Sequence, residues 1–189
     1  MTLLLATHNA GKAKEFARIL EPRGYSLKTL ADFNIQTAPK ETGTTFLENA
    51  RIKARAAMEE TNLPSLADDS GLCVDALKGA PGVYTAEYGG FSKAEEHIAH
   101  LLRQMEGAFN RKAAFVCQLV LLYPDGRELL AEGRCEGTIG HMPRGEKGFG
   151  YDPVFFVTGG RSMAELLPEE KDTLSHRGRA LEALLEILP

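Results

Sequence analysis

The sequence has few cysteines, no long apolar run and no surplus of positive charge. Its 189 residues include three cysteines, Cys73, Cys117 and Cys135, without a CxxC pair, which indicates reduced core thiols in a reducing compartment. The apolar run at the N-terminus is too short for a signal peptide, and no run approaches the roughly 20 residues of a membrane span. These absences predict a cytoplasmic protein that does not associate with a membrane.

The charge balance argues against a further class of protein. A formal net charge of −4 does not favour broad nucleic-acid binding driven by bulk charge. The apolar and charged fractions, 43% and 25%, are those of an ordinary globular protein, and the length allows a substantial core. Because no internal repeat, low-complexity tract or linker divides the chain, we expect one domain over residues 1–189.

Two adjacent carboxylates, Asp68 and Asp69, lie in the apolar stretch LADDSGLCVDAL. Charged residues rarely leave water unless they are paired or bind a metal. One interpretation is a turn between two strands, with Ser70 and Gly71 at its centre. The other is a site for a hard cation such as Mg²⁺, in which one carboxylate also orients a water molecule. This stretch alone leaves both open.

The N-terminal segment has the order expected of a phosphate-binding turn. An apolar run over Thr2–Ala6 predicts a buried strand, the polar turn THNAGK follows at Thr7–Lys12, and a helix is expected from Lys12 to Leu20. Backbone N–H groups at such a helix N-terminus cradle phosphates, and Lys12 adds a positive charge. Neither GxxxxGK[ST] nor GxGxxG is present, so an ordinary turn remains the alternative.

A second helix is predicted from Thr45 to about Thr61. Thr45 and Glu48 have the spacing of a capping box, so Glu48 is interpreted as a capping residue. Lys53 shares a face with small apolar residues, which favours a role in a site over a solvated lysine. Asn49 lies one turn before Lys53 and can point the same way.

The loop GEKGFGYDP, over Gly145–Pro153, combines glycines with two aromatic residues and one acid. Phe149 and Tyr151 can offer a flat surface to a base, and Asp152 can accept hydrogen bonds from ring N–H groups. A glycine-rich hairpin with its aromatic residues in the core is the alternative interpretation.

Three further segments complete the prediction of structure. Ser92 is expected to cap a helix over residues 93–105, and residues 111–137 form a hairpin without chemistry of its own. Near the C-terminus Ser175 can cap a last helix. His176 and Arg177 would then lie at the positive end of that helix, which the helix dipole disfavours, and this indicates a ligand there.

Together these segments match the needs of a nucleoside triphosphate bound with Mg²⁺: backbone N–H groups and cations for phosphates, carboxylates for the metal, and an aromatic wall for the base. The segments LLLATHNAGKAKE, ETGTTFLENARIKA, ADDSGLCVDALKGAPGVYTAEY, GFGYDPVF and SHRGRAL resemble those of the non-canonical purine nucleoside triphosphate pyrophosphatases, which act on inosine and xanthosine triphosphates. They occur in the family's order and cover nearly the whole chain.

The resemblance implies an elongated, two-lobed α/β fold, with a long mixed central sheet flanked by helices and the active site in the cleft between the lobes. It implies hydrolysis of ITP, dITP and XTP to the monophosphate and pyrophosphate, with Mg²⁺, by a homodimer. Three alternatives remain open: a Maf-like pyrophosphatase for modified pyrimidine nucleotides, a phosphatase that releases orthophosphate, and a nucleotide-binding regulator without turnover.

The resemblance also implies site residues. Asp69, as the base, and Lys53 are the expected catalytic residues, Glu41 and Asp69 the metal ligands, and Asp68 a further acidic neighbour. The residues expected to contact substrate are Thr7, His8, Asn9, Ala10, Gly11, Lys12, Ser70, Phe149, Gly150, Tyr151, Asp152, Lys171, His176 and Arg177.

Overall fold

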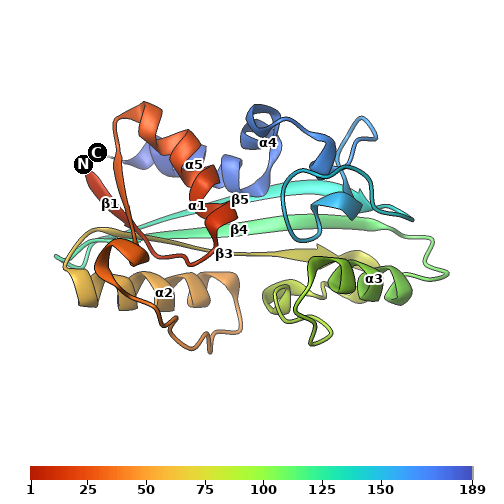
Figure 1. The fold of residues 1–189 in the computed structure, drawn as a ribbon, viewed down its shortest axis with the longest axis horizontal. Coiled ribbons are helices and arrows are strands. Elements are labelled where there is room, and N and C mark those ends of the chain that lie inside the picture. The colour runs from red at the N-terminus through yellow and green to blue at the C-terminus, as the bar shows by residue number, and fades with distance from the viewer. Residues whose placement is uncertain (189) are drawn as a thin grey trace. The chain divides into compact units, whose positions relative to one another are not determined.

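The computed structural model describes residues 1–188 as an α/β fold with a mixed six-stranded sheet flanked by helices (Figure 1). The strands are β1 Thr2–Leu5, β2 Ser26–Thr29, β3 Ser65–Val74, β4 Lys112–Leu122, β5 Glu128–Ile139 and β6 Phe155–Phe156. Their order in the sheet is β2-β1-β3-β4-β5-β6. Strand β1 is parallel to β2 and β3, whereas β6 is antiparallel to β5. The predicted fold class is thereby confirmed.

The helices are α1 Ala10–Leu20, α2 Phe46–Thr61, α3 Ala94–Gln104, α4 Pro168–Leu174 and α5 His176–Ile187. The capping box that begins α2 is confirmed, since the Thr45 hydroxyl accepts the Glu48 N–H and the Glu48 carboxylate accepts the Thr45 N–H. The predicted cap of α3 was wrong by one position, because Lys93 and not Ser92 precedes the helix. Helix α4 was not predicted.

The chain forms two compact units, each assembled from separate segments. Unit 1 takes in Met1–Asp69, Cys117–Gly133 and the described residues from Arg177 onward, and unit 2 takes in Ser70–Val116 and Arg134–His176. Strands β3, β4 and β5 each contribute residues to both units. Neither unit is therefore a contiguous stretch of sequence. The expectations of a single domain and of a site in a cleft stay predictions.

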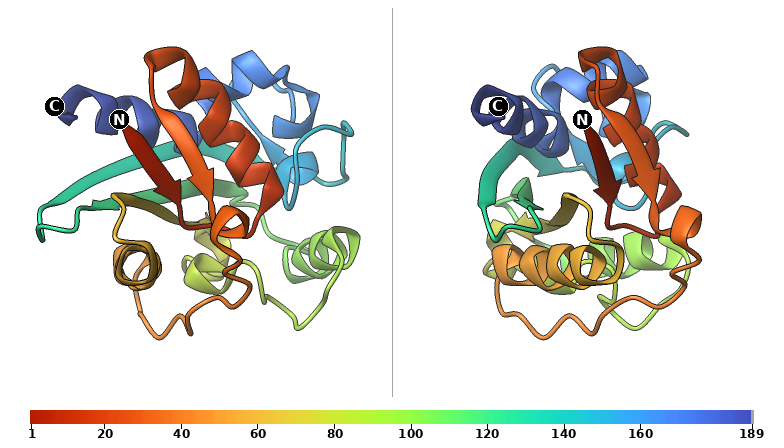
Figure 2. Two further views of the ribbon diagram at one scale, coloured as in Figure 1. Left: turned by 60° about the vertical axis from the view of Figure 1, so that its left-hand side comes forward. Right: turned by 90° about the vertical axis from the view of Figure 1, so that its left-hand side faces the viewer.

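Unit 1 is layered, with helices on both faces of its strands. Leu3 and Leu5 of β1 pack in one cluster with α1 and α5, whereas Leu4 and Ala6 pack in another with α2. Figures 1 and 2 show α1 and α5 on one side of these strands and α2 on the other. Successive side chains of a strand point to opposite faces, so a strand covered on both faces needs a continuous apolar run. The run predicted as a buried strand has this pattern.

The turn proposed at Ser70 and Gly71 does not exist. Strand β3 continues through both residues to Val74, and Gly71 does not adopt a positive φ. Asp68 and Asp69 are 2% and 7% exposed within this strand. The turn interpretation was wrong because it assumed solvated carboxylates, whereas both are buried against cations.

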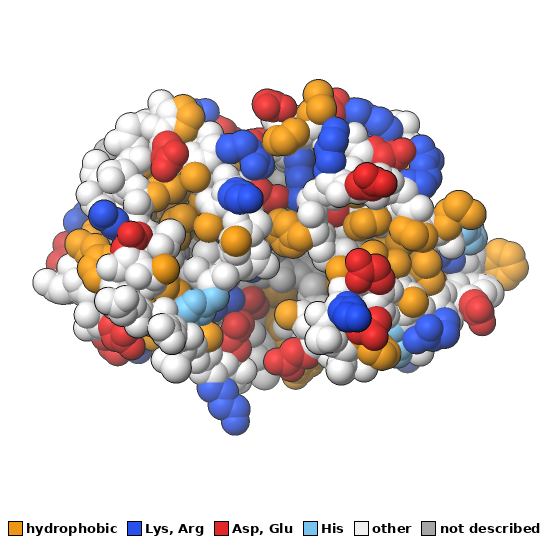
Figure 3. All heavy atoms as spheres, viewed as in Figure 1, with side chains coloured by type: hydrophobic (Ala, Val, Ile, Leu, Met, Phe, Trp, Pro, Cys, Tyr) orange, Lys and Arg blue, Asp and Glu red, His pale blue; other side chains and the backbone are white. Residues whose placement is uncertain are grey.

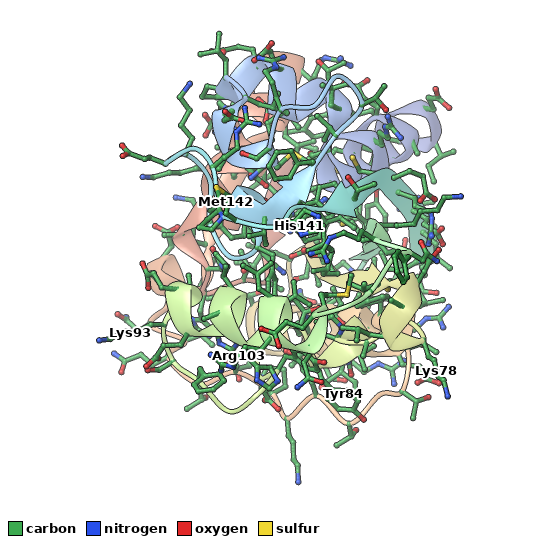
Figure 4. The ribbon with its side chains drawn as sticks, turned by 90° about the vertical axis from the view of Figure 1, so that its right-hand side faces the viewer. Lys78, Tyr84, Lys93, Arg103, His141 and Met142 are labelled. Atoms are coloured by element: carbon green, nitrogen blue, oxygen red, sulfur yellow. The ribbon has the colours of Figure 1, made fainter. Side chains whose placement is uncertain are left out.

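Unit 2 has one core cluster, in which α3 packs through Ile98, Leu101 and Met105. The glycine-rich loop contributes Tyr151 to this core. At the surface, Figure 4 shows Met142 on the loop after β5 and Tyr84 on the side of α3 away from that loop. These two side chains are 65% and 64% exposed.

Candidate active site

The turn after β1 is built by Asn9, which caps α1. The Asn9 Oδ1 accepts hydrogen bonds from the backbone N–H groups of Gly11 and Lys12, at 2.9 and 3.1 Å. The Asn9 N–H in turn donates to the Thr7 hydroxyl at 3.1 Å. Thr7 and Lys12 are half-buried, and His8 is exposed. The first turn of α1 contains no acidic residue, so its dipole leaves this end open to an anion.

Asp68 is held by two cations from distant parts of unit 1. The Lys12 Nζ lies 2.8 Å from Asp68 Oδ2, and the Arg177 Nη2 lies 3.1 Å from the same oxygen. Burial alone would raise the pKa of Asp68, but Lys12, Arg177 and Lys53 hold it well below its usual range. These contacts favour the ionised form of Asp68.

Arg177 is itself buried, at 2% exposure, and its Nη1 donates to a carboxylate oxygen of Glu15 on α1. Burial would lower the pKa of Arg177, yet Asp68 and Glu15 raise it. The cation at the start of α5 is thus explained by two carboxylates within unit 1. Glu15 was not predicted as a site residue, although its spacing of three residues from Lys12 places both on one face of α1.

Lys53 joins two carboxylates that are far apart in the chain. Its Nζ lies 2.8 Å from Asp69 Oδ1 and 3.2 Å from Glu41 Oε2. Burial would lower the pKa of Lys53, but Asp69, Asp68 and Glu41 outweigh it and raise the pKa. Burial raises the pKa of Asp69, and Glu41 raises it further against the opposing effect of Lys53.

Asp69 and Glu41 share one lysine, Lys53. Negative charge is therefore in excess at these two carboxylates. Carboxylate oxygens are the ligands that Mg²⁺ prefers, and one or two of them suffice when phosphates and water complete the coordination. Within residues 1–188 no group of three or more histidine, cysteine or acidic side chains is arranged to hold a metal ion. Asp69 and Glu41 thus offer two carboxylate groups that could hold a cation.

In unit 2, Asp152 is buried and contacts both its own loop and helix α4. Its Oδ2 lies 2.6 Å from the Lys171 Nζ and accepts the Phe149 N–H at 2.9 Å. The Lys171 Nζ lies 4.7 Å from the centre of the Phe149 ring. A Cβ on Gly148 would lie 2.1 Å from Asp152 Oδ2, and Gly148 has a φ of +76°, so this position requires glycine. The loop is arranged around the carboxylate of Asp152.

The aromatic residues of the loop have different surroundings. Phe149 is half-buried, whereas Tyr151 is 4% exposed and packs in the core of unit 2. Burial raises the pKa of Tyr151 to about 12. The structure thus gives Tyr151 the core position of the alternative interpretation, and leaves Phe149 as the ring nearer to solvent.

The remaining residues expected to contact substrate, Ser70, Gly150 and His176, lie in unit 2. The His176 ring stacks on Phe115 in unit 2, with ring centres 4.7 Å apart and planes 16° apart. Ser70 and Gly150 are half-buried in the same unit. Their expected contacts with substrate stay predictions.

Comparison with known proteins identifies the family. The model of the Ham1 family matches residues 3–187. A protein of Thermus thermophilus named dITP/XTP pyrophosphatase is 53% identical over 98% of this chain and 91% of its own length. A protein of Bacillus subtilis with the same name is 46% identical over 98% of this chain and 96% of its own length.

Solved structures agree with this assignment. The HAM1 protein from Coxiella burnetii has a TM-score of 0.89 and 41% identity, covering 99% of this chain and 98% of that one. The nucleoside-triphosphatase / dITP/XTP pyrophosphatase from Mycobacterium abscessus has a TM-score of 0.78 and 45% identity, with full coverage of both chains. The chain belongs to the Ham1 family.

Proposed function

We propose that this chain hydrolyses ITP, dITP and XTP to the nucleoside monophosphate and pyrophosphate, and so removes these nucleotides from the pool. The observation that carries the proposal is the contact of Lys53 with both Asp69 and Glu41. Relatives 46–53% identical over nearly the whole chain are named dITP/XTP pyrophosphatase, which supports the substrate class.

We propose that the triphosphate binds unit 1. The open N-terminal end of α1, the Lys12 Nζ and the Lys53 Nζ offer the positive charge that phosphate oxygens need. Asp68 holds Lys12 in place, and Arg177 neutralises Asp68 from the other side. Asp68 therefore positions a cation and does not need to change its protonation state.

Glu41 and Asp69 are the proposed ligands of a Mg²⁺ ion. When bound, the ion would neutralise charge that develops on the phosphate oxygens and lower the pKa of a water molecule. Asp69 would accept the proton of the attacking water, for which its raised pKa is suited. A bond forms between the water oxygen and the α-phosphorus, the bridging bond to the β-phosphate breaks, and pyrophosphate leaves.

The proposed basis of selectivity lies in unit 2, where an ammonium donor and a carboxylate acceptor are adjacent in Lys171 and Asp152. A 6-oxo purine presents an acceptor beside a ring N–H donor, and adenine presents the reverse. Adenine would set its amine donor against the ammonium and its bare ring nitrogen against the carboxylate, and such mismatched polar contacts reject a base strongly. Phe149 is the proposed ring surface.

A homodimer and a cytoplasmic location are further proposals. Phe109 and Met142 of unit 2 are highly exposed. Arg111, two residues after Phe109, donates to the carbonyl of Gly140, two residues before Met142. Hydrophobic side chains gather at this end of unit 2 in Figure 3. No helix among residues 1–188 is long and apolar enough to cross a membrane. Sedimentation of Phe109→Ser beside the unaltered protein tests the dimer.

A substrate panel tests the proposed reaction. Pyrophosphate and orthophosphate release are measured with ITP, XTP, dITP, GTP, ATP and modified pyrimidine triphosphates, with and without Mg²⁺. We expect Mg²⁺-dependent pyrophosphate release from the first three. Orthophosphate release, a preference for modified pyrimidines, or binding of ITP without turnover would each contradict the proposal in favour of the corresponding alternative.

A further inference from the structure

Asn49 is a buried amide in the first turn of α2. It is 3% exposed, and within residues 1–188 no other asparagine or glutamine is buried. Alanine forms helices better than asparagine, and burying an amide is unfavourable unless it is hydrogen-bonded. Helix formation alone therefore does not explain this residue.

Both ends of the Asn49 amide are used, and by different segments. Its Oδ1 accepts the backbone N–H of Gly43 at 2.8 Å, and its Nδ2 donates to Asp69 Oδ2 at the longer distance of 3.4 Å. A backbone N–H can only donate and a carboxylate only accepts, so the side chain between them needs one acceptor and one donor. Aspartate lacks the donor, and leucine has neither group.

These two bonds connect the segment of Glu41 to Asp69. Gly43 follows Glu41 by two residues, so the Asn49 bond fixes the backbone that presents the Glu41 carboxylate. Asp69 Oδ2 accepts the hydrogen bond from Asn49, and the other carboxylate oxygen, Oδ1, accepts one from the Lys53 Nζ. A Cβ on Gly43 would lie 2.6 Å from Asn49 Oδ1, so the close approach requires glycine.

We infer that Asn49 is a positioning residue that sets the spacing and orientation of Glu41 and Asp69 for a divalent cation. The inference rests on the proposed function, since it concerns the same metal site. Groups that orient metal ligands change metal affinity by about 10- to 100-fold when they are removed. Asn49 reaches one proposed ligand directly and the other through the backbone of Gly43.

The test measures Mn²⁺ binding by electron paramagnetic resonance, in the presence and in the absence of IMP and pyrophosphate. Asn49→Leu removes both bonds and keeps the branched shape of the side chain. Gly43→Ala would place a Cβ 2.6 Å from both Asn49 Oδ1 and Glu48 Cβ, which disrupts the same contact from the half-buried loop. Thr45→Ala is the matched control, because it removes the cap from the same helical turn and leaves the amide in place. Deuterium exchange at the Gly43 N–H reports the hydrogen bond itself.

We expect Asn49→Leu and Gly43→Ala to weaken Mn²⁺ binding by about 10- to 100-fold, with faster exchange at residue 43 in Asn49→Leu. Thr45→Ala should lower stability and change Mn²⁺ affinity by less than about twofold. Unchanged Mn²⁺ affinity in Asn49→Leu, or an equal loss of Mn²⁺ affinity in Thr45→Ala, would overturn the inference about Asn49. The proposed metal site would still stand. If Asn49→Leu does not fold, Gly43→Ala decides. Absence of Mn²⁺ binding by the unaltered protein would instead contradict the proposed metal site.

Discussion

Asp68 and Asp69 are neighbours in β3, yet their carboxylates contact different cations and their pKa values move in opposite directions. Asp68 contacts Lys12 and Arg177, which hold its pKa down, whereas Asp69 shares Lys53 with Glu41 and has a raised pKa. The strand thus separates a structural carboxylate from one that is suited to accept a proton.

Asp68→Asn should destabilise the fold. The substitution leaves Lys12 without the carboxylate of Asp68 and leaves Arg177 with Glu15 alone, and breaking a buried ion pair costs about 3–5 kcal/mol. Urea unfolding at pH 7 measures the loss. A change below about 1 kcal/mol would contradict the structural role assigned to Asp68.

The contribution of Asp68 to stability should depend on pH with a definite sign. Its folded pKa is lowered, so it stabilises the fold fully above its unfolded pKa of about 3.9 and loses this effect as the pH falls further. The difference in unfolding free energy between the unaltered protein and Asp68→Asn should be constant from pH 5 to 7 and shrink below pH 4. A difference that grows on acidification would contradict this account.

Asp69→Asn should abolish turnover without loss of stability. Removal of a general base lowers the rate by about 10²–10⁴-fold. Because burial and Glu41 raise the folded pKa of Asp69, its ionised form lowers stability at pH 7, so the neutral amide should leave stability unchanged or higher. Steady-state rates with ITP and urea unfolding measure the two effects. A loss of unfolding free energy alongside the loss of rate would indicate that Asp69 is a structural residue.

Gly148→Ala should impair recognition of the base. The new Cβ would displace the Asp152 carboxylate from Lys171 and Phe149, and we expect KM for ITP to rise about tenfold, as for a lost hydrogen bond to a charged group. Gly107→Ala is the control. Gly107 has a similar φ of +72° but nothing within 4 Å of its Cβ position, so this variant introduces backbone strain alone. Equal effects in both variants would assign the change to strain.

The thiol of Cys117 should be inert in the folded protein. Burial and the nearby Asp68 raise its pKa to about 12, so almost no thiolate is present at pH 8. A chromogenic disulfide reagent should modify the half-buried Cys73 first and reach Cys117 only in urea. Mass spectrometry of the modified peptides identifies the order. Early modification of Cys117 would contradict its buried position.

Features set by local sequence were predicted well. The N-terminal strand, the capping box at Thr45 and Glu48 and the hairpin of β4 and β5 depend on neighbouring residues, and the structure confirms them. The family's motifs named Lys12, Lys53 and Glu41. The structure places Lys12 against Asp68, and Lys53 against Asp69 and Glu41, while the roles of these residues stay predictions.

Features set by distant residues were not predicted. The turn at Ser70 was wrong because the cations that allow Asp68 to be buried come from α1 and α5, far away in sequence. Glu15 was missed because its partner, Arg177, lies 162 positions away. The core position of Tyr151 depends on the packing of unit 2.

The most direct test of the proposed reaction is hydrolysis of ITP in water labelled with ¹⁸O, with Mg²⁺ present, followed by mass spectrometry of the products. If water attacks the α-phosphorus, the label appears in the phosphate of IMP and pyrophosphate is unlabelled. Label in pyrophosphate, or in orthophosphate released beside IDP, would contradict the reaction proposed for Asp69, Lys53 and Glu41.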